Sequence, residues 1–498
     1  MPHVRSWVGR LTGVAAALAC STVALGQPVE RQVRDLFSRI KLGGASVSVC
    51  VVDATTGEVL AGIDENRPML PASNLKVLTS GAALLALGKD FDFRTRLVID
   101  GTRLIVVGAG DPGLADPELL GEMKLSVGAF ADRLIDSIRP AVPAGVRLTE
   151  VILDDRVFDR DAVHPSWPAD QLNRWYCAEV SGLNFHANVL QVFATGSPKP
   201  GQPASLRTEP SAPWIELINS VQTVGTGSSA IALYRDGATG FRFRVTGTVR
   251  PIAMDPVEVT VHDPALLLGR LLADRLAAAG LAGPSLNVRL AADDDRFDLS
   301  RVAAVVRTPL ATALKRCNSD SHNLYAESLL KRLGHEVTGQ PGSWANGAAV
   351  VRMQVSERLG GDLGALVMAD GSGLSRENRV TARLLATWMA SVGRAEQGTG
   401  DLYIESMATP GEGSWSNRFR DLAKLQSQFK GKSGFINDVL CLSGFLIHPN
   451  GRRLTFSVLA NGTNQAPPGK VREFQEAVVE QLDRWMARAG PGRPAVGG

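Results

Sequence analysis

Cysteine is scarce in this sequence of 498 residues, which contains five in all. Cys20 lies in an apolar N-terminal stretch, and the other four are Cys50, Cys177, Cys317 and Cys441. Four cysteines are too few for a disulfide framework in a chain of this length. Cys50 and Cys441 lie in strand-like apolar runs, where a buried thiol is expected, and no disulfide pairing is predicted.

Clustered histidine and excess charge are also missing. The seven histidines are scattered, with no pair at metal-ligand spacing, so we predict no metal site and no cofactor. The 53 basic and 50 acidic residues leave a net charge of +3 and no long basic run, which argues against nucleic acid as a partner. After the first 26 residues, no apolar run is long enough to span a membrane.

Residues 1–26 have the pattern of a secretory signal peptide. Arg5 and Arg10 precede LTGVAAALACSTVALG, an apolar stretch too short to cross a bilayer, and small residues precede Gln27. We therefore expect an exported protein, located in the periplasm or the cell envelope. An uncleaved anchor is the alternative, while ALAC, which ends at Cys20, is a poor lipoprotein site.

The hydrophobic periodicity predicts an α+β protein. A helix, a β-hairpin and a second helix come first, short alternating strands dominate from about 91 to 300, and mixed helices and strands follow. The expected helices lie at 28–41, 73–87, 265–280, 308–334 with a break, 347–360, 380–393 and 470–490. Strands near both ends of the chain are expected to share one sheet covered by helices, with the β-rich module inserted between them.

The segment LPASNLKVLTSG, residues 70–81, places Ser73 and Lys76 one turn apart on one helix face. In the plainer interpretation, Ser73 caps the helix and Lys76 extends to water. In the other, Lys76 accepts a proton from Ser73. A second S-x-x-K, Ser38 to Lys41, lies in the first amphipathic helix and is interpreted as a solvated face. The apolar stripe of the 73–87 helix consists of Leu75, Leu78, Ala82 and Leu85.

Two further motifs follow in the chain. Ser321-His322-Asn323 forms an S-x-N at the expected break between two helices, and Lys432-Ser433-Gly434 opens a strand as a K-[ST]-G. A further S-x-N, 285–287, lies inside a strand-like run and lacks this context. S-x-x-K, S-x-N and K-[ST]-G in this order are the three motifs of penicillin-recognising serine enzymes.

The chemistry explains why such residues belong together. Ser73 becomes a nucleophile when a base takes its proton. Burial and the second cation Lys432 would lower the pKa of Lys76 and make it that base. Ser321 would relay the proton to the leaving amine, and the Asn323 amide would hold Lys76 and a substrate amide.

The third motif is expected to bind substrate. Lys432 and the Ser433 hydroxyl would bind a substrate carboxylate, and Gly434 completes the motif. The backbone N–H groups of Ser73 and Phe435 would form the oxyanion hole, in which each donor contributes about 3–4 kcal/mol to transition-state stabilisation.

With these motifs the sequence resembles the D-alanyl-D-alanine carboxypeptidase/endopeptidases, the low-molecular-mass class C penicillin-binding proteins. The resemblance covers nearly the whole mature chain. It includes ASVSVCVVDATTGEVL, VVGAGDPGL, SGLNFHANVL, SHNLYAESLL, FSVLANGT and above all DGSGLSRENRVTARLL. It implies a serine β-lactamase-like domain, an antiparallel sheet flanked by helices, made from 27–90 and 301–498. The insertion would form two further domains, one from 91–189 and 261–300 and one nested within it at 190–260.

The resemblance also implies an activity. Ser73 would attack the carbonyl between the two terminal D-alanines of peptidoglycan stem peptides. Members also cut D-alanyl–diaminopimelate cross-links, and β-lactams acylate the same serine. Peripheral association with the membrane is compatible with the resemblance, and nothing in the sequence indicates an oligomeric state. The chain departs from the usual family pattern at two positions. The third motif is K-S-G where K-T-G is commoner, and the middle residue of S-x-N is His322 where aspartate is frequent. No catalytic role is expected for His322.

Three other interpretations compete with this one. Gly108–Gly113 matches the dinucleotide pattern G-x-G-x-x-G, but a turn-like, proline-interrupted segment follows it, so a tight turn is expected. A β-lactamase or esterase would need a water-activating element such as Glu-x-x-x-Asn between the last two motifs, which we do not find. An inactive cell-wall-binding scaffold is the third, although every motif residue that the chemistry needs is present.

Overall fold

The structure is a computed structural model that describes residues 28–488, except 238, 362, 364, 397 and 420–423. The predicted signal peptide at 1–26 and Cys20 therefore lie outside the described residues. Within the described part, no helix is both long and apolar enough to cross a membrane. The four cysteines in this part are buried free thiols.

A five-stranded antiparallel sheet joins the two ends of the chain, in the order β14-β15-β16-β1-β2. Its strands are β1 Ser46–Asp53, β2 Val59–Ile63, β14 Gln428–Ile436, β15 Val439–Ile447 and β16 Arg453–Asn461. β15 is buried on both faces along almost its whole length, because helices cover both sides of the sheet. The predicted sharing of one sheet by strands from both ends is confirmed.

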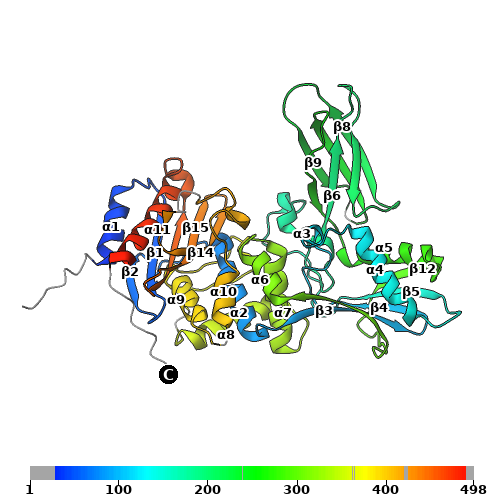
Figure 1. The fold of residues 1–498 in the computed structure, drawn as a ribbon, viewed down its shortest axis with the longest axis horizontal. Helices are drawn as coiled ribbons and strands as arrows, with labels where there is room; N and C mark the ends of the chain where they lie inside the picture. The colour runs from blue at the N-terminus through cyan, green and yellow to red at the C-terminus, as the bar shows by residue number, and fades with distance from the viewer. Residues whose placement is uncertain are drawn as a thin grey trace, which may run out of the picture.

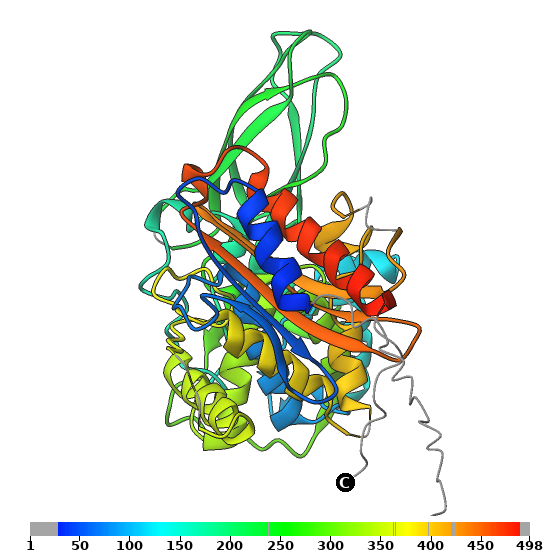
Figure 2. The ribbon, with the colours of Figure 1, turned by 90° about the vertical axis from the view of Figure 1, so that its left-hand side faces the viewer.

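Two layers of helices enclose this sheet. One face is covered by α1 Val29–Arg39 and α11 Lys470–Arg488, which lie side by side across it (Figure 2). The other layer consists of α2 Lys76–Leu87, α6 Leu310–Asn318, α7 Asn323–Thr338, α8 Trp344–Arg358, α9 Ala382–Gly393 and α10 Thr399–Glu405. Alternate residues of β1 point into the two cores: Val49 and Val51 toward α1 and α11, and Cys50 and Val52 toward α2 and α9. The predicted α+β class is confirmed.

Helix α2 differs from its predicted one-sided apolar stripe. All residues from Lys76 to Leu84 are buried, because α6, α7, α9 and α10 pack around it. A helix that is buried on every side forms the centre of a domain. The helix that carries Lys76 is therefore held from all directions.

The inserted region begins with a mixed five-stranded sheet in the order β12-β5-β4-β3-β13. Its strands are β3 Asp92–Asp100, β4 Arg103–Val107, β5 Leu148–Asp154, β12 Ala282–Leu290 and β13 Val302–Pro309, accompanied by α3 Pro117–Glu122, α4 Val127–Ile138 and α5 Pro264–Ala278. Asp92 pairs with Pro309, so the chain leaves and re-enters the helical layer at adjacent points (Figure 1). β13 thus belongs to this sheet although it lies beyond 300, and α3 and α4 were not predicted.

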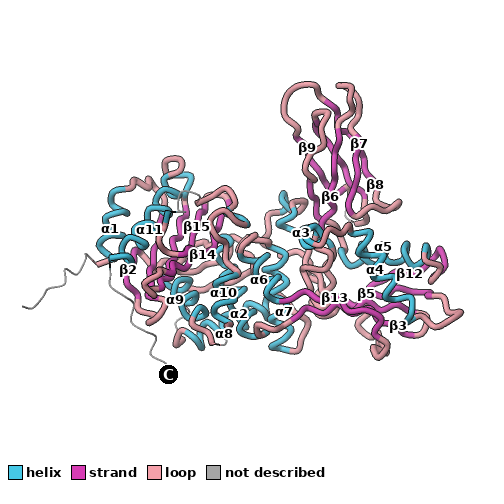
Figure 3. The backbone as a smooth tube through the Cα atoms, viewed as in Figure 1, coloured by secondary structure: helices cyan, strands magenta, loops and turns pink. Residues whose placement is uncertain are grey.

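Two three-stranded sheets form a lobe that projects from the rest of the molecule (Figures 1 and 3). They contain β6 Val189–Thr195, β7 Ser205–Glu209 and β11 Val257–Thr260 in one, and β8 Glu216–Thr223, β9 Ala230–Arg235 and β10 Arg242–Val249 in the other. These strands fall within or next to 190–260, and the domain boundaries themselves stay a prediction. The glycine-rich stretch at 108–113 is a tight loop, in which a β-carbon on Gly108 would lie 2.2 Å from the Gly182 carbonyl oxygen.

Candidate active site

Ser73 lies on a single 3-10 turn, η1 Ala72–Leu75, that leads directly into α2. Its Oγ accepts a hydrogen bond of 3.1 Å from Nζ of Lys76, the first residue of α2. Lys76 is completely buried, so the interpretation in which it extends to water is wrong. Neither η1 nor α2 has a side-chain cap, and Ala72 has a φ of +45°, a conformation that L-residues seldom adopt outside constrained sites.

The amine of Lys76 has two further partners. It donates to Oδ1 of Asn323 at 2.7 Å and to the carbonyl oxygen of Ser372 at 2.9 Å. Burial lowers the pKa of Lys76 to about 8, and nearby Cys317, Glu327 and Asp370 act in the opposite direction. A hydroxyl is therefore paired with an amine that loses its proton near neutral pH.

Ser321 lies in the loop between α6 and α7, with a φ of +63°. Its Oγ accepts a hydrogen bond of 2.7 Å from Nζ of Lys432. This amine also donates to the carbonyl oxygen of Ser433. Lys432 is completely buried, and burial, followed by the charge of Lys76, lowers its pKa well below the usual range. Burial is the main cause of the lowered pKa at both amines, as expected for Lys76, and the charge of Lys76 lowers the pKa of Lys432 further.

The third motif lies on β14, directly beside the 3-10 turn. The Ser433 hydroxyl accepts a hydrogen bond of 2.9 Å from Nε1 of the buried Trp415. A β-carbon on Gly434 would lie 3.0 Å from the backbone nitrogen of Ser73. Phe435 follows and is 70% exposed. The strand segment and the turn that carry the two predicted oxyanion donors are thus in contact, while the oxyanion hole itself stays a prediction.

Sequence reasoning missed Glu327, which is completely buried on α7. Its carboxylate accepts hydrogen bonds of 2.8 Å from the backbone N–H groups of Gly371 and Ser372 and from Nε1 of Trp344. The Ser372 carbonyl oxygen in turn accepts from Lys76. Burial raises the pKa of Glu327 to about 7. Glu327 therefore holds the loop that contacts the Lys76 amine.

The loop itself belongs to DGSGLSR, which contributed to the resemblance but was assigned no role. The carboxylate of its buried Asp370 accepts from the backbone N–H groups of Gly373 at 2.9 Å and Ser375 at 2.7 Å. A signal for the position of Glu327, but not for its partner loop, was present in the sequence. Glu327 follows Asn323 by four positions, which places a carboxyl group on the motif's own face of α7.

The inserted region closes one side of the site. The Asn323 side-chain amide donates to the Tyr176 carbonyl oxygen at 2.8 Å. His322 packs between the rings of Trp175 and Tyr325, with ring centroids 5.3 and 5.1 Å away. Burial lowers the pKa of His322 to about 3, so the imidazole is neutral at ordinary pH. Within the described ranges, no group of three or more His, Cys, Asp or Glu side chains is placed to bind a metal ion.

A hydroxyl paired with a buried amine, a second buried lysine beside a serine, and an antiparallel sheet between helix layers define a class of protein. It is the class of serine acyl-transfer enzymes with the penicillin-binding fold. The chain belongs to the D-Ala-D-Ala carboxypeptidase 3 (S13) family, whose sequence profile matches residues 29–487. It is thus a serine-type D-Ala-D-Ala carboxypeptidase, and the family is one of cell-wall peptidases.

Individual relatives agree with this assignment. The chain is 30% identical over 504 aligned positions to a D-alanyl-D-alanine carboxypeptidase of Actinomadura sp. (strain R39), covering 97% of this chain and 89% of that protein. It is 24% identical to a carboxypeptidase of Mycobacterium tuberculosis, covering 97% and 88%. The crystal structure of penicillin binding protein 4 from Haemophilus influenzae has the same fold, with a TM-score of 0.72 at 21% identity, and covers 91% of this chain and 99% of that one.

Proposed function

We propose that this chain is an exported D-Ala-D-Ala carboxypeptidase and endopeptidase that acts on peptidoglycan stem peptides through an acyl-enzyme on Ser73. One observation carries the proposal. The amine of Lys76 is completely buried, has a pKa lowered to about 8, and lies 3.1 Å from the Ser73 hydroxyl. Among the described lysines, only Lys76 and Lys432 are both buried and hydrogen-bonded to a serine hydroxyl, and both lie in this site.

In the first step Lys76 accepts the Ser73 proton, and Oγ attacks the carbonyl carbon between the two terminal D-alanines. The terminal carboxylate binds Lys432 and the Ser433 hydroxyl, which Trp415 orients. The negative charge that develops on the carbonyl oxygen is stabilised by the backbone N–H groups of Ser73 and Phe435. Asn323 holds the Lys76 amine in place.

In the second step the C–N bond breaks and D-alanine leaves. Ser321 passes a proton from Lys76 to the leaving amine. In the structure its hydroxyl accepts a hydrogen bond from Lys432, and Lys76 bonds to Ser73, Asn323 and Ser372. Water then enters, gives a proton to Lys76 and attacks the ester carbonyl. Lys76 returns this proton to Oγ of Ser73 as the ester bond breaks, so the hydroxyl is restored and the shortened peptide is released.

The substrates and inhibitors follow from the relatives. The penicillin binding protein 4 of Haemophilus influenzae has a crystal structure in complex with a β-lactam, and its fold matches this chain with a TM-score of 0.66 at 20% identity. We infer that β-lactams acylate Ser73, since a β-lactam offers the same reactive carbonyl to the same nucleophile. Export rests on the signal-like sequence of residues 1–26.

Mass spectrometry of a penicillin adduct tests the proposal. Wild-type protein should gain one penicillin on the peptide that contains Ser73, and Ser73→Ala should gain none. Ser38→Ala, which alters the other S-x-x-K on the solvent-exposed side of α1, is the matched control and should be labelled like wild type. Labelling of Ser73→Ala would overturn the assignment, and turnover of nitrocefin faster than release of D-alanine would indicate a β-lactamase.

A further inference from the structure

The backbone of Ser321 adopts a conformation that its surroundings must hold. Its φ of +63° lies in the left-handed region, which L-residues other than asparagine and aspartate seldom adopt. Such a conformation persists where neighbouring groups fix it. The hydroxyl that the proposed reaction uses as a proton relay therefore depends on what holds residues 319–322, the loop between α6 and α7, which we call the Ser321 loop.

Arg316, near the end of α6, holds both chain neighbours of Ser321. Its side chain donates a hydrogen bond of 2.9 Å to the carboxylate of Asp320, and its carbonyl oxygen accepts one of 3.0 Å from the backbone N–H of His322. The His322 ring also packs against the ring of Tyr325 on α7, with centroids 5.1 Å apart. The Ser321 loop is thus fixed by Arg316 at its start and by Tyr325 at its end.

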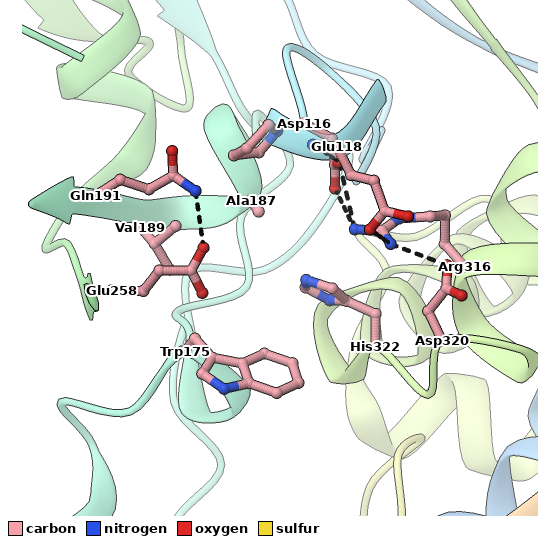
Figure 4. Close-up of a pocket in the computed structure, with 11 residues that line it drawn as sticks. Asp116, Glu118, Trp175, Ala187, Val189, Gln191, Glu258, Arg316, Asp320 and His322 are labelled. Atoms are coloured by element: carbon pink, nitrogen blue, oxygen red, sulfur yellow. Dashed lines mark hydrogen bonds and ion pairs between the residues drawn. The ribbon is translucent and has the colours of Figure 1, made fainter. Parts of the chain in front are cut away.

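One carboxylate from the inserted region joins these two residues. Asp116 accepts hydrogen bonds from the Arg316 guanidinium at 3.1 and 3.3 Å and from the Tyr325 hydroxyl at 2.9 Å. Figure 4 shows the guanidinium of Arg316 between Asp116, which belongs to the inserted region, and Asp320, which belongs to the Ser321 loop. Asp116 therefore connects the two helices that flank this loop.

Asp116 is itself rigidly held. It is completely buried, and its Oδ1 caps α3 by accepting hydrogen bonds from the backbone N–H groups of Glu118 at 2.9 Å and Leu119 at 3.2 Å. Burial raises the pKa of Asp116, but the positive charge of Arg316 outweighs burial, and the net shift of this pKa is downward. The carboxylate is therefore charged at neutral pH and binds the guanidinium as an ion pair.

We propose that Asp116 is a positioning residue that fixes the Ser321 hydroxyl for proton transfer to the leaving amine. It acts through Arg316 and Tyr325 and does not touch the reacting atoms. Lys432 holds the same hydroxyl at 2.7 Å, so the relay is positioned from the catalytic sheet and from the inserted region together. The inference rests on the proposed function, since it takes Ser321 as the relay, and it gives the inserted region a part in the chemical step.

The leaving group distinguishes a misplaced relay from general damage to the site. An amine leaves after it receives a proton, whereas a thiolate leaves without one, because a thiol is a far stronger acid than an amine's N–H. The matched substrates are a peptide that ends in D-alanyl-D-alanine and a thioester in which thioglycolate replaces the last D-alanine. Both keep the terminal carboxylate that Lys432 and Ser433 are proposed to bind, and kcat/KM reports on acylation in both.

Asp116→Asn keeps the shape of the side chain and removes the charge that holds Arg316. It should lower kcat/KM for the peptide about tenfold, which is part of the contribution of about 100-fold or more that a positioned proton donor makes, and should leave the thioester within about twofold of wild type. Tyr325→Phe removes one donor to Asp116 and should lower the peptide value in the same direction by a smaller factor. In Ser321→Ala, which lacks the relay, adding Asp116→Asn should cause no further loss.

Asp132→Asn is the control, because Asp132 is an exposed carboxylate of the inserted region that pairs with Arg275, and it should change neither rate. Equal losses for the two substrates in Asp116→Asn would overturn the inference, as would a further loss when Asp116→Asn is added to Ser321→Ala. Equal losses in Ser321→Ala itself would reject the relay and the inference with it. Failure of wild type to cleave either substrate or to form a penicillin adduct would instead reject the proposed function as a whole.

Discussion

Gly434 lies directly against the turn that carries Ser73: a β-carbon added to Gly434 would come 3.0 Å from the backbone nitrogen of Ser73 and 2.8 Å from the carbonyl oxygen of Pro71. These are backbone atoms at distances that real β-carbons hardly ever show, so β14 or the turn would have to move. The glycine of the third motif is therefore needed for close approach of two backbones. The proposed oxyanion hole, formed by the N–H groups of Ser73 and Phe435, depends on this close approach.

Gly434→Ala should slow acylation by penicillin on the order of 100-fold, because it separates the two proposed oxyanion donors. The measurement is the second-order rate of adduct formation by stopped-flow fluorescence or mass spectrometry. Gly283→Ala is the control, since nothing lies within 4 Å of a β-carbon at that position of β12. An acylation rate within twofold of wild type for Gly434→Ala would contradict this account.

The acylation rate should rise with pH through the pKa of Lys76. The amine must be uncharged to accept the Ser73 proton, and burial lowers its pKa to about 8. Below that value the neutral fraction, and with it the rate, should fall about tenfold for each pH unit, while above it the rate should level off. The profile is measured with a penicillin whose own charge is constant over the range. A rate that does not change between about pH 6 and pH 8 would contradict this assignment of the base.

The periodicity and the motifs predicted much of this molecule. Valine-rich and apolar runs indicated the strands β1, β15 and β16, and the break at Asn318–Ser321 predicted the loop between α6 and α7. The three motifs were expected to converge. The structure places the Lys76 amine within hydrogen-bond distance of Ser73 and Asn323, and the Lys432 amine within that of Ser321. The strands and the helix break follow from the local residue pattern, and the grouping of the motif residues follows from a reaction that needs them in contact.

What the sequence did not indicate depends on packing between distant segments. The burial of α2 on all sides comes from helices more than two hundred positions away, and no stripe within α2 predicts it. The strand β13 lies beyond 300, at a position where no strand was predicted, and its place beside β3 is set by the return of the chain. The contact of Glu327 with the loop at 370–373 links two segments far apart in the sequence, and the residue pattern of neither segment indicates that they meet.

Glu327→Gln should move the acid limb of the acylation profile to lower pH. The negative charge of Glu327 raises the pKa of Lys76 against the larger effect of burial, so its removal should lower that pKa further. The neutral amine would then persist at lower pH. The measurement is the same pH profile of penicillin acylation. A merely structural defect would lower the acylation rate at every pH without moving the acid limb.

Glu336→Gln serves as the matched control, because Glu336 is an exposed carboxylate on the same helix that pairs with Arg332. It should leave the limb in place. For Glu327→Gln, a limb that stays where it is in wild type, or that moves to higher pH, would show that Glu327 does not set the proton affinity of Lys76.

Ser433→Ala should raise the KM for peptides that end in D-alanyl-D-alanine by about tenfold, the effect of losing about one hydrogen bond to a charged group. The Ser433 hydroxyl is held by Nε1 of the buried Trp415 and is thereby available to the substrate carboxylate, and Lys432 remains in the variant to bind that carboxylate. The kcat should change much less than the KM, because the hydroxyl does not touch Ser73 or Lys76 in the hydrogen-bond network of the site. Ser433→Thr keeps the hydroxyl and restores the commoner K-T-G form, so it should retain a KM close to that of wild type. A larger loss in kcat than in KM for Ser433→Ala, or an equal loss in both variants, would assign Ser433 to the chemical step or to packing against Trp415 instead of to carboxylate binding.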